Sequence, residues 1–186
     1  MPEVLCRERS GHEDLQEEGG GVMSTLLAID PGSTESGWVV IDTDTFEPLE
    51  FGKDANNTLL DYLRDGRLDE DAAVIEMVAS YGMAVGKDVF ETCVWIGRFS
   101  ESLTGRTVPE LVYRRPVKLH HCHSAKAKDS NIRQALVDRF ASGQPNYGKG
   151  TKAQPGWFYG FNADIWQAYA LAVYAADTQL DEGETQ

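Results

Sequence analysis

Three short apolar runs, separated by turn-forming residues, open the patterned part of the chain. Val, Ile, Leu and Trp dominate each run, which is typical of strands, and Pro31-Gly32 supplies a turn after the first. The runs are too closely spaced for a crossover helix, so they are expected to pair antiparallel. The sequence therefore predicts a three-stranded meander over about residues 25–30, 36–42 and 46–52.

Beyond residue 55 the apolar positions alternate between helical and strand-like spacing. Strands are expected over residues 72–78 and 111–113, and helices over about 56–63, 87–103, 129–140 and 163–179. Asn56 or Asn57 is expected to cap the first helix and Asp129 the third. The last helix is apolar nearly all round, which predicts that it is largely buried. Together these elements predict an α/β fold with a five-stranded mixed sheet flanked by helices.

Three segments lack this periodicity. Residues 1–22 are polar and rich in Glu and Gly, so they are expected to be a disordered or non-native extension, with natural translation starting at Met23. Residues 181–186 are expected to form a flexible acidic tail after a domain spanning 23–180. Residues 142–160 hold five glycines and two prolines, which predicts a long loop that is functional or mobile.

The composition is that of an ordinary globular chain. A length of 186 residues suits one domain with a substantial core. We expect no membrane span, since no run of about 18 apolar residues occurs, and no signal peptide, since no charged start precedes an apolar run. Three scattered cysteines indicate a reducing compartment, here the cytoplasm, and no disulfide framework.

The net charge of −13 argues against a nucleic-acid partner, but its distribution does not. Between Arg98 and Lys152 eleven basic residues face only four acidic ones, and local charge decides how a polyanion is attracted. Any one of these basic residues could be an ordinary surface side chain. The candidates for phosphate contacts are Lys118, Lys126, Lys128, Arg133, Lys149 and Lys152.

Three acids lie in unusual places. Asp30 closes the first predicted strand, Glu76 interrupts a buried one, and Asp164 lies in the first turn of the last helix. Buried acids are costly unless paired, and a divalent cation is a common partner. Oxygen ligands suit magnesium or manganese. Two such ions, about 3.5–4 Å apart, can hold the attacking and leaving oxygens of a phosphodiester.

Each acid also has a structural interpretation. Asp30 could be a turn residue, Glu76 could face outward from an edge strand, and Asp164 could simply favour the helix dipole. Two other motifs mimic binding sites. Residues 143–150 nearly spell a phosphate loop but lack the Ser or Thr that follows its Lys. Residues 120–123 hold three histidines and a cysteine too close together to face one zinc ion.

Taken together, the acidic segments resemble a known family. Residues 28–32, 75–76 and 164–172 are similar to the three motif regions of RuvC-type Holliday junction resolvases. The resemblance covers about residues 24–178. Further segments resemble the bacteriophage branch, which would place the protein in a bacterial host cell; they are residues 82–87, 95–99 and 127–136.

This resemblance implies an RNase H-like fold and a homodimer that nicks four-way DNA junctions with magnesium or manganese. It assigns catalysis and metal binding to Asp30, Glu76 and Asp164. A fourth family acid is replaced by Gln167, whose carbonyl could ligate an ion without adding charge. It also places Tyr81 in a loop that reaches toward the junction, where its ring could stack on a base.

The leading hypothesis is therefore a structure-selective DNA endonuclease. A second hypothesis keeps the nuclease chemistry but changes the substrate to forks, flaps or RNA–DNA hybrids. A third is a DNA-binding module without catalysis, which the uncharged Gln167 and the negative net charge favour. A phosphotransferase of the actin type is excluded by length, because the chain is too short for two such lobes.

Overall fold

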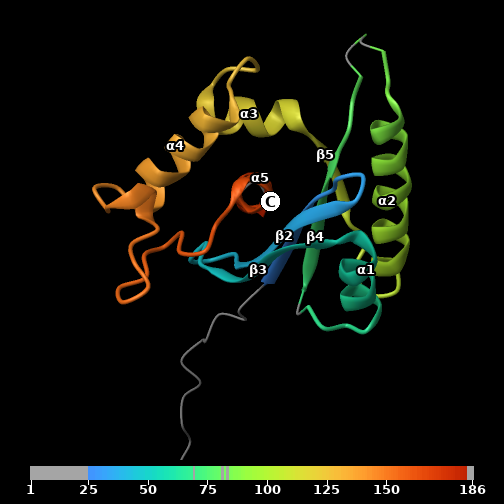
Figure 1. The fold of residues 1–186 in the computed structure, drawn as a ribbon, viewed down its shortest axis with the longest axis horizontal. Helices are drawn as coiled ribbons and strands as arrows, with labels where there is room; N and C mark the ends of the chain where they lie inside the picture. Colours follow the sequence, from blue (N-terminus) through green and yellow to red (C-terminus); the bar gives the residue numbers. More distant parts are fainter. Residues whose placement is uncertain (1–24, 69, 81, 83, 184–186) are drawn as a thin grey trace, which may run out of the picture.

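The computed structural model of the chain describes residues 25–68, 70–80, 82 and 84–183 (Figure 1). Residues 1–22, expected to be an extension, lie outside the described residues, as does Tyr81. No helix in the described part is long and apolar enough to cross a membrane.

A five-stranded mixed sheet forms the centre of the fold, as the sequence predicts. Its strands, in chain order, are β1 (Thr25–Asp30), β2 (Glu35–Asp42), β3 (Pro48–Ala55), β4 (Ala72–Met77) and β5 (Glu110–Tyr113). Their order across the sheet is β3-β2-β1-β4-β5. The first three strands pair antiparallel, whereas β4 runs parallel to both β1 and β5.

Helices cover the two faces of this sheet (Figure 1). On one face, α1 (Asn56–Arg64) and α2 (Lys87–Leu103) enclose a core with the odd-numbered residues of β1. On the other face, α5 (Ala163–Gly183) packs on the sheet, and α3 (Arg114–Cys122) and α4 (Asp129–Phe140) pack on α5. Ala168 to Val173 of α5 have no exposed surface, which confirms the prediction of a buried final helix.

Several boundaries differ from the sequence-based expectations. The helix α3 was not predicted, and α5 continues to Gly183, three residues into the expected tail. Neither asparagine caps α1, because Ala55 is its N-cap and makes no side-chain bond to the helix. Asn56 instead accepts a hydrogen bond from Ser36 Oγ at 2.6 Å. Asp129 is the first residue of α4, whose N-cap is Lys128.

The long loop after α4 is folded against the core. It contains a short 3₁₀ turn, Asn146–Gly148, and closes back on itself through a bridge between Gly150 and Pro155. Gly148 has a positive φ of 73°, and a Cβ there would lie 2.4 Å from the Cβ of Ala141. The close approach holds this loop beside α4.

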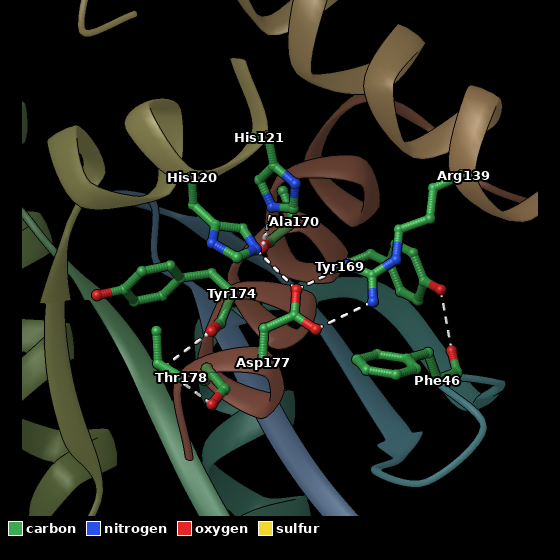
Figure 2. Close-up of polar contacts among 10 residues, drawn as sticks. Phe46, His120, His121, Arg139, Tyr169, Ala170, Tyr174, Asp177 and Thr178 are labelled. Atoms are coloured by element: carbon green, nitrogen blue, oxygen red, sulfur yellow. Dashed lines mark hydrogen bonds and ion pairs between the residues drawn. The ribbon is translucent and has the colours of Figure 1, made fainter. Parts of the chain in front are cut away.

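The histidines that resembled a metal cluster join helices instead (Figure 2). Asp177 of α5 lies 2.7 Å from His120 Nε2 and accepts two hydrogen bonds from Arg139 of α4. His121 Nε2 donates to the backbone oxygen of Ala170 at 2.8 Å. Burial lowers the pKa of His121 to about 4, so this ring stays neutral. These contacts fix α3 and α4 on α5.

Candidate functional site

One row of residues crosses the sheet at the end of β1. Asp30 pairs with Gly37 of β2, which in turn pairs with Lys53 of β3. On the other side, Ile29 pairs with Ile75 of β4, so Glu76 follows beside Asp30. Because side chains alternate along a strand, Asp30 and Glu76 share the face of the sheet that α5 covers. The strand register therefore brings two distant acids together.

The first turn of α5 supplies the third acid. Asp164 lies over Gly37, where a Cβ atom on the glycine would be 2.9 Å from the Cβ of Asp164. A side chain at position 37 would thus hold α5 away from the sheet. The three predicted site acids come from β1, β4 and α5, and all three reach the same end of the sheet.

The carboxylates of this site affect one another's pKa values. Burial, together with the charges of Glu76 and Asp164, raises the pKa of Asp30 to about 8, although the charge of Arg114 opposes the shift. Burial also raises the pKa of Glu76, although the charge of Arg114 opposes that shift. The charged form of a carboxyl group is disfavoured by neighbouring carboxylates, and a cation that binds between these groups favours it.

Two side chains of the protein already supply cations here. Arg114, at the start of α3, donates to Glu76 Oε2 at 2.9 Å and to Asp129 Oδ1 at 2.8 Å, and it also donates to Gln167 Oε1. Lys53 Nζ lies 2.8 Å from Asp164 Oδ2 and contacts Glu35 as well. Each outer acid of the site therefore has its own basic partner.

Asp30 differs from its neighbours, because its carboxylate has no hydrogen-bond or salt-bridge partner within the described residues. In that part of the chain, no three His, Cys, Asp or Glu side chains are gathered as one ligand set. The donors are nevertheless all oxygens, which suit a hard divalent cation. The residues that could hold such a cation are Asp30, Glu76 and Asp164. Gln167 is not among them, because its carbonyl oxygen already accepts a hydrogen bond from Arg114.

The structural interpretation of Glu76 as an outward-facing edge residue is wrong. Its strand β4 lies between β1 and β5, and the Glu76 side chain is only 15% exposed. Asp164 contacts Lys53 across the sheet, so its role is not limited to the helix dipole.

The predicted phosphate-binding residues take different positions around this site. Lys118 of α3 is near enough to lower the pKa of Glu76. Lys126 and Lys128 are exposed on the turn between α3 and α4, and Lys152 is exposed on the long loop. Lys149 turns inward, because its Nζ donates to the backbone oxygen of Phe161 at 2.5 Å.

Arg133 lies on α4 near Asp129. Its guanidinium packs over the ring of Tyr147 at 5.0 Å. It also lines a hollow of about 170 Å³ with Asp129, Trp166 and Gln167. This hollow opens at the N-terminal end of α5, next to the site.

Sequence reasoning missed Arg114, Asp129 and Lys53 as members of the site. Arg114 counted only as part of the basic stretch, and Asp129 was interpreted as a helix cap. The strand alternation contained a signal for Lys53, because it shares a face with Phe51, which packs beneath α5. No pattern in the sequence marks the other two.

The fold of the chain is similar to that of two solved structures. The RuvC of Thermus thermophilus in complex with a Holliday junction substrate matches with a TM-score of 0.62 at 12% identity, covering 84% of this chain and 96% of that one. The T. thermophilus RuvC structure matches with a TM-score of 0.61 at 13% identity over the same shares. This likeness establishes the RuvC-like, RNase H-like fold. By sequence, the chain matches no protein-family model and no curated protein.

Proposed function

We propose that this chain is a metal-dependent endonuclease that cuts four-way and related branched DNA. The observation that carries the proposal is the convergence of Asp30, Glu76 and Asp164 from three separate elements at one end of the sheet. The shared fold with a resolvase that has been solved on a Holliday junction supports the choice of substrate.

In this proposal Asp30, Glu76 and Asp164 hold magnesium or manganese. An ion held by these residues would supply activation of the attacking water and stabilisation of the departing oxygen of the phosphodiester. Asp30 is the central ligand, since it alone of the three has no basic partner within the described residues. Its position at a strand end keeps its carboxylate rigid. The exposed Lys126, Lys128 and Lys152 would contact phosphates and place the DNA backbone beside these acids.

Two active sites are needed to nick both strands of a junction, so the proposal includes a homodimer. Large apolar side chains are exposed on α2 and on the edge strand β5. Phe90 and Val94 of α2 are 63% and 60% exposed, and Leu111 and Tyr113 of β5 are each 47% exposed. Packing this patch against its copy would bury apolar area and leave both acidic sites free.

The test is cleavage of a synthetic four-way junction with mapped nick positions, with magnesium or manganese supplied. A replication fork and an RNA–DNA hybrid serve as competing substrates. We expect paired nicks in opposing strands of the junction, and none with Asp30→Asn, which should still bind it. Cleavage by that variant would disprove the role of Asp30. Junction binding without cleavage under either metal would favour a DNA-binding module.

A further inference from the structure

Arg114 makes more contacts with the candidate site than an ordinary surface arginine would make. Its guanidinium donates to Glu76 of β4, Asp129 of α4 and Gln167 of α5. A single side chain thus joins three elements at the edge of the acidic site. Only the planar, multi-donor head of arginine suits such a position, because a lysine ammonium is a point charge on a flexible stem.

The surroundings hold this side chain in place. Arg114 is only 19% exposed, and its backbone starts α3 directly after β5. The guanidinium of arginine keeps its positive charge in proteins, and here it lies between the carboxylates of Glu76 and Asp129. Arg114 is therefore a permanent cation of the site.

The charges in the cluster indicate how many further cations it needs. Five carboxylates contact this cluster, and they belong to Asp30, Glu35, Glu76, Asp129 and Asp164. Three of their charges are balanced by Arg114, by Lys53 and by Lys118, which acts on Glu76. The remaining two negative charges match one divalent cation. A second divalent cation would bring an excess of positive charge into a partly buried place.

Gln167 also indicates that the site holds a single divalent cation. A second ion between Glu76 and Gln167 would need a charged ligand, but Gln167 is neutral and its oxygen is already bonded to Arg114. One oxygen of Glu76, Oε2, also accepts a hydrogen bond from Arg114, which leaves the other oxygen without a partner among the described residues.

We propose that Arg114 takes the place of a second metal ion, so that each chain binds a single divalent cation. Asp30, Asp164 and the free oxygen of Glu76 hold that cation. Arg114 is a positioning residue, because it orients Glu76 and Gln167 and balances their surroundings. The inference rests on the proposed function, since it assumes the same metal site.

The experiment measures the number of Mn²⁺ ions bound per full-length chain, by electron paramagnetic resonance and calorimetric titration without DNA. The variants are Arg114→Met, Gln167→Asp and their combination, with Arg115→Met as the matched control on the adjacent, exposed arginine. We expect one ion for the unaltered chain, for each single variant and for the control. The double variant removes the resident cation and adds a carboxylate, so it should bind two.

Two bound ions in the unaltered chain would overturn the inference, and that measurement needs no variant to fold. A folded double variant that still binds one ion would also overturn it. Junction cleavage by the same preparation separates this failure from that of the proposed function. Cleavage with two bound ions would disprove only the single-ion inference. If the chain showed no metal binding and no cleavage, both the inference and the proposed function would be disproved.

Discussion

Gly37 lies directly beneath Asp164, and a Cβ atom added to Gly37 would be 2.6 Å from the backbone oxygen of Asp164. Real Cβ atoms do not approach oxygen so closely, so the first turn of α5 rests on bare backbone of β2. The same glycine pairs with Asp30. One residue without a side chain thus sets the separation of two acids of the candidate site.

Gly37→Ala should therefore push the start of α5 off the sheet. We expect a loss of stability of about 1–3 kcal/mol, as for other overpacked positions, together with weaker metal binding. Chemical denaturation and Mn²⁺ titration measure the two effects. Gly97→Ala is the control, because its Cβ would meet no atom within 4 Å and alanine favours a helix. Equal stability for both variants would contradict the steric role of Gly37.

Asp30→Asn should stabilise the metal-free protein while abolishing cleavage. The folded state raises the pKa of Asp30 from 3.8 to about 8, so the stability of the native chain falls as pH rises between these values. Removing the titration should add on the order of 4 kcal/mol at pH 7. Thermal melts in EDTA measure the gain, and added magnesium should reduce it. A destabilised variant would show that Asp30 is a structural residue.

His121 should make the fold sensitive to mild acid. The unfolded histidine binds its proton near pH 6.5 and the folded one near pH 4, so stability is complete above 6.5 and falls as pH drops toward 4. The total loss from this group is about 3 kcal/mol at most. His121→Gln should flatten the stability curve over this range. His123→Asn, at an exposed position, should leave the slope unchanged.

Lys126→Ala combined with Lys128→Ala should weaken junction binding without altering the fold. If each lysine contacts a phosphate, the slope of log affinity against log salt should fall by about 2. Fluorescence anisotropy with a labelled junction, in EDTA and at several salt concentrations, gives this slope. Arg64→Ala, on α1 across the sheet from α5, is the control. An unchanged slope would remove both lysines from the DNA contact.

Phe90→Lys should turn a dimer into a monomer. The substitution places a charge in the exposed patch of α2, where association would bury it without a partner. Sedimentation velocity measures the change in mass. Leu49→Lys is a matched control, because it alters an exposed apolar residue on the opposite edge strand β3. A monomeric parent chain would contradict the dimer itself.

The sequence identified the central acids because each one breaks an apolar pattern. Asp30 and Glu76 lie in strands whose other residues are buried, so their polarity stood out. Arg114 and Asp129 were missed for the opposite reason. Each begins a helix, where polar residues are ordinary, and only the packing of α3 and α4 on α5 turns them toward the site.

The helix α3 was missed because it has almost no apolar face. Val117 is its only buried residue, and the helix is held by the contacts of His120 and His121 with α5. Polar contacts between distant residues leave no periodic trace in a sequence. Strands β1, β2 and β4, by contrast, were located well, since burial on both faces of a sheet produces continuous apolar runs.

The row that crosses the strands at Asp30 makes the candidate site a direct product of strand register. If β4 paired with β1 one residue out of step, Glu76 would turn to the opposite face, among the leucines of α1 and Phe99 of α2. If the proposed function is correct, a chain with this shifted register would lack the site and would not cut DNA. Nicking activity would serve as a quality check on refolded protein, because only correctly paired molecules would possess it.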